Sequence, residues 1–257
     1  MKKYCLAAAL SMAFLAPAAH ADTLLGLYVG VDGWQSDNSG SFSDSGNMQD
    51  FNFEDETFIS YYAALEHPIP LVPNIKLKYT ELELNGSTLL NETFEFGGTS
   101  FTTNTTATTI SDLSHVDYIL YYEIFDNDLL SFDFGLTARD FDGDVTLAAQ
   151  ITTDSGTTTQ SDSIAVTDIV PMLYVATNVG LPLTGLNLYA QGNFLSFDDH
   201  TLYDYEVGVS YELIDNLAVD MNINLGYRAV KLELEDLNDL YTNIEFDGVF
   251  IGTTIHF

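Results

Sequence analysis

The sequence predicts an all-β protein: a transmembrane, antiparallel, up-and-down β-barrel of about ten strands, with about eight as the alternative. Apolar and polar residues alternate over many segments, which is the side-chain period of a strand with two different faces. The connections alternate between short turns and long polar loops, as in barrels with short periplasmic turns and long extracellular loops. The chain also ends on an alternating segment whose last residue is aromatic, Phe257.

The clearest element is a hairpin that runs from Tyr203 to Tyr227. Its first strand places apolar residues at the odd positions up to Leu213, with polar residues or glycine between them. After the turn at 214–216, the same parity returns from Leu217 onward. One face is therefore apolar and the other polar over the roughly 9–11 residues that a membrane-spanning strand needs. The pattern is typical of strands that face lipid.

The same period predicts ten strands along the chain. Tight turns are indicated by the three prolines of 68–73 and by the segments 126–128 and 181–185. The predicted strands have the approximate bounds 24–35, 57–67, 74–84, 115–125, 129–141, 168–180, 186–197, 203–213, 217–234 and 243–257. Long polar loops are predicted at 36–56, 85–114 and 142–167.

Alternation alone does not separate a membrane barrel from a soluble one, which would bury its apolar face. The polar faces carry almost no lysine, unlike a soluble exterior, and Phe257 resembles the C-terminal signal that the barrel-assembly machinery recognises. The apolar faces carry tyrosines near their ends, as a girdle at a membrane interface would: Tyr203, Tyr205, Tyr211 and Tyr227. We therefore expect lipid outside the barrel and polar side chains inside it.

Two segments divide the 257 residues: a cleaved signal peptide, 1–21, and a single barrel domain, 22–257. Lys2 and Lys3 precede an apolar run that is too short to span a membrane, and Pro17 and the small-residue site 19–21 follow it. This pattern predicts export to the cell outer membrane of a Gram-negative bacterium. Cys5, the only cysteine, would leave with the signal.

Charge limits the partners. The chain has 7 Lys and Arg against 38 Asp and Glu, so loss of Lys2 and Lys3 would leave a net charge of −33. Nucleic acid is therefore excluded as a partner. Outer-membrane lipid, lipopolysaccharide and the barrel-assembly machinery are expected partners. Divalent cations at the acidic segments 50–56 and 233–239 are a further candidate, although neither segment has the spacing of a calcium loop, and solvated negative surface is the alternative.

If polar faces line the lumen, the few basic residues become informative. The predicted lumen network joins Lys76, Lys78, Arg139 and Arg228 with Asp32, Asp117, Glu123, Asp133, Asp204, Glu206, Glu212 and Asp220. Such a network is either a structural plug of ion pairs or a charge-selective constriction. Bulky residues at lumen positions favour the plug and predict no wide pore: Tyr28, Trp34, Tyr62, Tyr121, Tyr174, Tyr189 and Phe250.

Four segments carry a family resemblance: 66–75, 96–101, 135–143 and 181–186. With them, the mature chain resembles an uncharacterised family of small proteobacterial outer-membrane β-barrels with a Gly-Gly loop signature. The resemblance implies the fold and the location but no activity, so it implies no functional residues. Gly97-Gly98 itself indicates a tight bend with positive φ, and no strand-to-helix context supports a phosphate cradle there.

Some barrels of this kind are enzymes, and a histidine near an aspartate is a candidate general base. The candidates are His115 with Asp117, the segment Asp198-Asp199-His200, and Asp140, Asp142 and Asp144. The arrangement is similar to the water-activating residues of omptin proteases, which are also ten-stranded. Chance adjacency of abundant aspartates is the alternative, so no catalytic residue, metal ligand or cofactor is assigned. The predicted role is structural or porin-like passage of narrow solutes; the alternative is a surface binding protein or an omptin-like rim hydrolase.

Overall fold

The computed structural model describes residues 25–257 except 128, 154–155, 198–199, 217–218 and 238–239, so the predicted signal peptide lies outside the described residues. Its strands alternate inward and outward side chains as the sequence predicts. The strands that form the barrel are β1 (Gly26–Ser43), β3 (Glu56–Glu66), β4 (Asn74–Thr80), β9 (His115–Asn127), β10 (Leu130–Phe141), β13 (Ile169–Leu181), β14 (Leu186–Phe197), β15 (His200–Ile214), β16 (Asp220–Leu237) and β17 (Leu240–His256). No helix in this part of the chain is long and apolar enough to cross a membrane.

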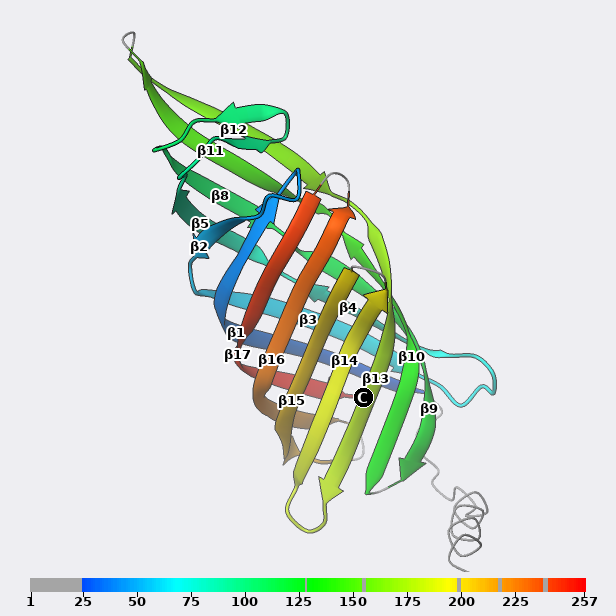
Figure 1. Ribbon diagram of the computed structural model, residues 1–257. Coiled ribbons are helices and arrows are strands. Elements are labelled where there is room, and N and C mark those ends of the chain that lie inside the picture. The colour runs from blue at the N-terminus through cyan, green and yellow to red at the C-terminus, as the bar shows by residue number, and fades with distance from the viewer. Residues whose placement is uncertain (1–24, 128, 154–155, 198–199, 217–218, 238–239) are drawn as a thin grey trace, which may run out of the picture.

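These ten strands close into an antiparallel barrel, which confirms the predicted fold class (Figure 1). Each pairs with its neighbours around the ring β1-β17-β16-β15-β14-β13-β10-β9-β4-β3, and β3 pairs with β1 to complete it. At the closing strand, Trp34 lies between Phe250 on one side and Phe58 on the other. Phe257 exchanges backbone hydrogen bonds with Leu27, so the C-terminus lies beside the beginning of β1.

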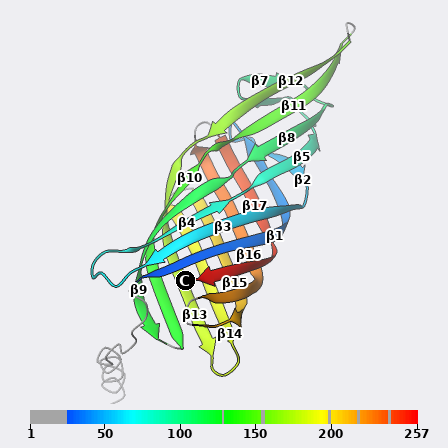
Figure 2. The ribbon, with the colours of Figure 1, turned by 180° about the vertical axis from the view of Figure 1, so that it is seen from behind.

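The long segments predicted as irregular loops are instead mostly strands. They form an extension that continues the sheet from the end of β1, in the order β2-β5-β8-β11-β12 (Figure 2). Its strands are β2 (Gln49–Phe53), β5 (Glu83–Leu89), β8 (Thr106–Asp112), β11 (Gly143–Thr153) and β12 (Gly156–Val166). The prediction was wrong because Thr, Ser and Asp on the outer face dominate the composition. The apolar inner residues, such as Phe51 and Phe53, alternate with them at the strand period.

A small hairpin, β6 (Phe94–Phe96) with β7 (Thr99–Phe101), lies beside the extension. Gly97 and Gly98 form its turn with φ of 61° and 89°, so the positive-φ bend predicted for the Gly-Gly pair is confirmed. An added Cβ at Gly97 would lie 2.8 Å from Asp162 Cγ, whereas the space at Gly98 is open. The first glycine is therefore required both by the backbone and by its neighbour.

The outside of the barrel is an apolar belt with sharp limits. On β16, Ile223, Leu225 and Tyr227 are exposed, and the next outward positions beyond Ala229 are Lys231 and Glu233. On β10 the exposed apolar positions end at Leu136, short of Asp140. The outer face of the extension is by contrast mainly Thr, Ser and acidic residues. A band of this kind matches a hydrocarbon layer, with the extension beyond it in water.

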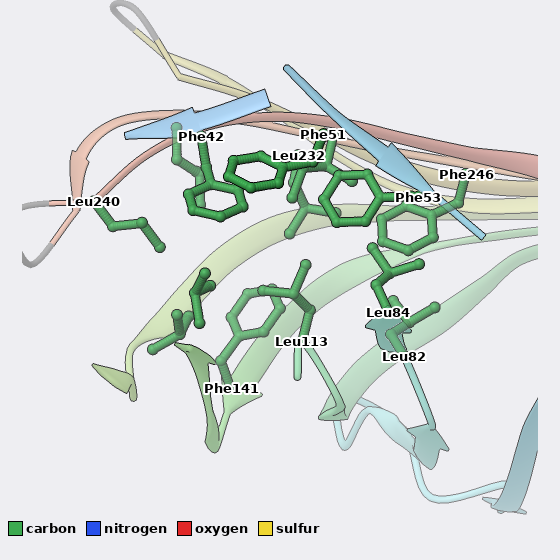
Figure 3. Close-up of a cluster of buried hydrophobic side chains, with 14 of the residues drawn as sticks. Phe42, Phe51, Phe53, Leu82, Leu84, Leu113, Phe141, Leu232, Leu240 and Phe246 are labelled. Carbon is green, nitrogen blue, oxygen red and sulfur yellow. The ribbon is translucent and has the colours of Figure 1, made fainter. Parts of the chain in front are cut away.

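The interior beyond the belt is not polar, as the alternation had predicted, but apolar (Figure 3). Phenylalanines of the extension pack there against the ends of β16 and β17: Phe42 stacks on Phe51 with ring centroids 4.2 Å apart and meets the edge of Phe96 at 5.3 Å. Leu232 and Phe246 complete this apolar core from the barrel side and are fully buried. The inner face of the extension therefore packs against the ends of β16 and β17, because its apolar side chains need a partner to exclude water.

Candidate functional site: the charged lumen

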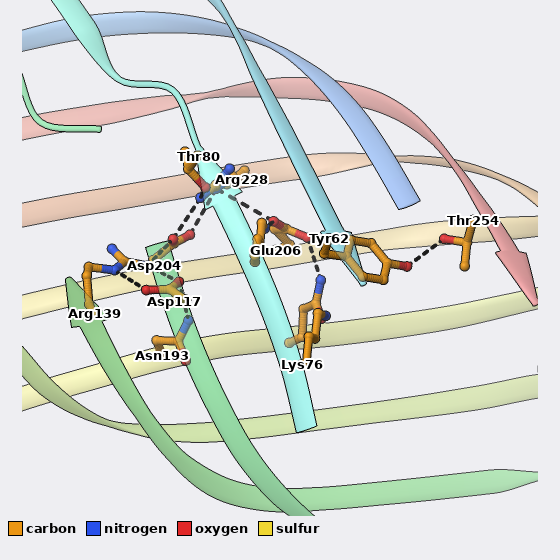
Figure 4. A network of polar contacts seen from close by, with 12 residues as sticks. Tyr62, Lys76, Thr80, Asp117, Arg139, Asn193, Asp204, Glu206, Arg228 and Thr254 are labelled. Carbon is orange, nitrogen blue, oxygen red and sulfur yellow. Dashed lines mark hydrogen bonds and ion pairs between the residues drawn. The ribbon is translucent and has the colours of Figure 1, made fainter. Parts of the chain in front are cut away.

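Arg139 of β10 is the centre of the lumen, and its side chain is completely buried. Its Nε and Nη2 donate to the two oxygens of Asp117, each at 2.7 Å, and Nη2 also donates to Asp204 Oδ2 at 2.7 Å (Figure 4). Asp117 is the register partner of Arg139 on β9, whereas Asp204 reaches it from β15 on another part of the wall. The fork geometry with Asp117 makes this a strong, directional ion pair.

Arg228 of β16 shares Asp204 with Arg139. Its Nε donates to Asp204 Oδ1 at 2.9 Å and its Nη2 to Oδ2 at 2.7 Å, while Nε lies 3.6 Å from Glu206 Oε1. The guanidinium also lies over the ring of Trp34, 4.7 Å from its centroid. Asp204 is thus held between two guanidinium groups, and its charge is compensated from both sides.

The network continues across the lumen through Glu206. Its carboxylate forms an ion pair with Lys78 of β4 and accepts a hydrogen bond from Gln191 Nε2 at 2.6 Å. Gln191 Oε1 in turn accepts one from Lys76 Nζ at 2.9 Å, and this ammonium lies 4.4 Å from the ring centroid of Tyr62. The hydroxyls of Tyr62 and Thr254 are 2.8 Å apart. Strands from opposite walls are therefore joined through side chains.

Charges in the network balance. The buried set contains the cations Lys76, Lys78, Arg139 and Arg228 and the anions Asp32, Asp117, Asp204 and Glu206. Among the described ion pairs none involves Asp32, which lies in the same lumen. Equal numbers of opposite charges keep this buried set neutral, which is what burial of so many ions requires.

Four of the acids predicted for the network lie elsewhere. Glu123 is exposed at the end of β9, and Asp133 is half-buried at its register partner on β10. Glu212 lies at the turn end of β15, and Asp220 pairs with His256 at 3.3 Å. Face parity predicts which side of the sheet a residue takes but carries no information on its height in the barrel.

The sequence prediction missed the uncharged members of the network. Thr137 donates to Asn193 Oδ1 at 2.5 Å, and Asn193 Nδ2 lies 3.4 Å from Asp117 Oδ2. Thr80 accepts from Arg228 at 3.3 Å. All three, like Gln191, are polar residues at lumen-facing positions, so the strand period contained the signal that would have found them.

The position of His115 does not suit the general base for which it is a candidate. A general base must be accessible to a substrate, but His115 is buried below the apolar core, and Phe141 packs edge-on against it at 5.3 Å. Its Nδ1 is 3.0 Å from the carbonyl of Leu113 and so carries the proton that this contact requires. No substrate reaches a base in this position without opening the core above it.

His115, Asp117 and Asp204 nevertheless place one possible metal ligand each within 4.8 Å of one another. Both carboxylates are already bonded to guanidinium groups, and a cation here would lie against Arg139. The geometry is therefore that of an ion-pair network and does not offer an open cation site.

The remaining candidates lie on the extension or at its base. His200 Nδ1 accepts a hydrogen bond from the backbone N–H of Glu235 at 3.3 Å, and its neighbours Asp198 and Asp199 lie outside the described residues. Asp142 and Asp144 are exposed where β10 continues into β11. The acidic segment 50–56 spans β2 and the start of β3. The segment 233–239 begins within β16 and runs past its end, where its last two residues are not described.

Aromatic residues fill the lumen on the turn side of the network. Tyr121 and Tyr174 are buried with ring centroids 5.7 Å apart, and the Tyr121 hydroxyl donates to Glu66 at 2.8 Å. All the bulky residues predicted to face the lumen do so: Tyr28, Trp34, Tyr62, Tyr121, Tyr174, Tyr189 and Phe250 are buried or half-buried. The interior is thus occupied by side chains over its length.

A closed antiparallel barrel with an apolar outside and a packed, charged lumen defines the class: the fold is that of outer-membrane β-barrel proteins. The structure is similar to the outer membrane protease OmpT from Escherichia coli, with a TM-score of 0.53 and 8% sequence identity over 94% of this chain and 99% of that one. At this identity the similarity shows the fold alone.

Weaker similarities involve the attachment invasion locus protein Ail of Yersinia pestis and the translocator domain of the autotransporter NalP from Neisseria meningitidis. Ail has a TM-score of 0.33 and 10% identity, covering 91% of this chain and 100% of Ail. The NalP domain has 0.40 and 12%, covering 98% and 97%. No protein-family model and no curated protein sequence matches the chain.

Proposed function

We propose that this chain is an exported outer-membrane protein whose barrel is a closed anchor and whose extracellular extension binds a partner at the cell surface. Of the two sequence-based roles, passage of narrow solutes and surface binding, this proposal takes the second. The observation that carries it is that two layers of side chains close the lumen. The ion-pair network crosses it at the height of Arg139 and Glu206, and the apolar core fills it above.

Solute passage would require both layers to open. Breaking a buried ion pair by removing one partner typically costs about 3–5 kcal/mol. Passage would have to break the contacts that Arg139 and Arg228 make with Asp204, and the contact of Lys78 with Glu206. The core beyond them would then have to be hydrated, at roughly 25 cal/mol for each Å² of apolar surface. A structural plug therefore fits the lumen better than a charge-selective constriction.

Planar-bilayer recording tests the closed lumen. We expect the refolded protein, inserted at a density verified by immunoblot, to give no stable conductance steps, because the ion-pair network and the apolar core occupy the lumen. A general porin inserted in the same way is the positive control. Stable steps on the nanosiemens scale would show that the lumen conducts and would overturn the proposal.

Location and partners belong to the same proposal. The segment 1–21 and the terminal Phe257 support export and assembly in the outer membrane, with lipid and lipopolysaccharide around the belt. Membership of the Gly-Gly barrel family and divalent cations at the acidic segments stay predictions. We assign no catalytic residue, because His115 is buried and His200 is engaged by the backbone of Glu235.

A further inference from the structure

The strand β12 lies at the margin of the extension, as Figures 1 and 2 both show. It pairs with β11 along its whole length, with Val166 opposite Gly143 and Gln160 opposite Ala149. Among the described strands it has no other ladder partner. The outer edge of residues 158–165 therefore presents alternate backbone N–H and C=O groups away from the sheet.

This edge carries few of the devices that natural proteins use to block strand addition, and the inward-pointing charge of Asp162 is one that it does carry. Residues 158–165 contain no lysine, arginine or proline, and their one charge is Asp162. The β6–β7 hairpin meets β12 through inward-facing side chains: Thr99 Oγ1 donates to Asp162 Oδ2 at 2.7 Å, and Gln160 Nε2 donates to the carbonyl of Ser100 at 3.2 Å. The hairpin thus supports the inner face of β12 through side-chain bonds.

The charges around this edge have one sign. Asp142 and Asp144 are exposed at the base of the β11–β12 hairpin, with Asp140 just below. The only basic residue of 22–257 outside the lumen is Lys231, which lies on β16 between Glu233 and Glu245. A second copy of so acidic a chain would be repelled, whereas a lysine-bearing segment would be attracted to the base of the hairpin.

We propose that the outer edge of β12 binds an extended, lysine-bearing polypeptide segment as an added strand. Main-chain hydrogen bonds to residues 158–165 supply affinity, and Asp142 and Asp144 select the basic end of the segment. The inference rests on the proposed function, since it makes the extension the binding part of the molecule and names the chemistry of its partner.

The test uses the full-length mature protein in detergent and a fluorescent synthetic peptide in which threonine and valine alternate after two lysines. The control peptides have the same side chains but carry N-methyl groups at every second residue, in either parity. We expect saturable binding that one N-methylated peptide weakens by at least about tenfold, because several ladder bonds of about 1 kcal/mol are lost together. No binding, or equal binding of all three peptides, would overturn the proposal.

Proline substitutions in β12 test whether the peptide binds to its outer edge. Successive residues of an antiparallel strand direct their N–H groups to opposite sides, so one of Gln160→Pro and Ser161→Pro removes an outward donor and spares the β11 ladder. The variant that keeps wild-type thermal stability should lose the peptide. Retained binding in that variant contradicts the proposal; if both variants unfold, the N-methylated peptides decide. Asp142→Asn with Asp144→Asn should weaken binding about fivefold and reduce its salt dependence.

Location is tested separately. The predicted mature chain has no cysteine, so Ser161→Cys can be labelled in intact cells with a membrane-impermeant maleimide. Absence of labelling would contradict the surface exposure in the proposed function without affecting peptide binding in detergent. A Ser161→Cys disulfide between two copies, with dimers in solution, would assign the edge to self-association and overturn the proposed partner.

Discussion

At the scale of single residues, the lumen depends on compensation of charge. Arg139 touches Asp117 and Asp204 with every bond at 2.7 Å, and both carboxylates are buried. A lone buried carboxylate in this place would have neither water nor a counter-ion. The consequence is that the two members of a pair should be far more tolerable to lose together than singly.

We predict that Arg139→Gln lowers the free energy of unfolding by about 3–5 kcal/mol, because it leaves Asp117 uncompensated. Arg139→Gln with Asp117→Asn should recover a part of that loss. Urea titration in lipid vesicles, arranged as a double-mutant cycle, measures the coupling. Lys231→Met is the control: its partner Glu245 is exposed and its ion pair lies at the surface, so it should cost less than about 1 kcal/mol. Equal losses for Arg139 and Lys231 would refute the buried network.

For these basic residues, the sequence predicts the side of the sheet but not the ion-pair partner. The strand period predicted that Arg139, Arg228, Lys76 and Lys78 face the lumen. It could not predict that Lys78, whose register neighbour is Asp117, pairs with Glu206 instead. That choice depends on the stagger of strands around the closed ring, which no local pattern contains.

At the scale of elements, the extension is the part that sequence reasoning misjudged. Thr and Ser on its outer face look like loop composition, although pairs such as Leu82 and Leu84, or Val145 and Leu147, repeat at the strand period. Its strands are stable only as a set, because each contributes one face to a shared apolar core. The β6–β7 hairpin adds Phe96 and Phe101 to that core.

We predict that Phe42→Ala destabilises the extension by about 3–5 kcal/mol, since it opens a cavity between Phe51 and Phe96. Limited proteolysis should then cleave the extension while the detergent-embedded barrel stays intact. Leu89→Ala, at an exposed position of β5, is the matched control and should leave the cleavage rate unchanged. Comparable cleavage of both variants would show that the extension has no cooperative core.

The contact of the hairpin with β12 predicts a pH dependence. The Thr99 hydroxyl donates to Asp162 and holds the pKa of this carboxyl below its usual value of 3.8. A lowered pKa means that the ionised form is favoured by folding, so the contribution is complete at neutral pH and is lost only as the pH falls through the acid range below about 3.9. The protection of the β6–β7 amides against hydrogen exchange, relative to the intrinsic exchange rate at each pH, should therefore fall there, and Asp162→Asn should abolish that fall. An identical profile in both proteins would contradict this coupling.

At the scale of the whole molecule, the limits of the belt separate two environments on one continuous sheet. Outward positions on β16 change from Leu225 and Tyr227 to Lys231, while inward positions change from the charged Arg228 to the apolar Leu232 at nearly the same height. The barrel is thus apolar outside where it is charged inside, and polar outside where it is apolar inside. This inversion explains how one alternating sequence serves both a lipid-facing barrel and a water-facing extension.

This inversion can be tested, because it predicts that the outside of the barrel contacts lipid and the outside of the extension contacts water. Leu225 is 60% exposed between Val209 and Ile251, in the middle of the belt, and Ile110 is 50% exposed on the outer face of β8 in the extension. We predict that Leu225→Arg costs about 2–4 kcal/mol in lipid vesicles, as a cation within a hydrocarbon layer does. Ile110→Arg should change stability by no more than about 0.5 kcal/mol, because its side chain already faces water. Urea unfolding of both variants in the same vesicles measures the difference. Equal, small effects would mean that the belt faces water, and the assignment of lipid to the outside of this barrel would then fail.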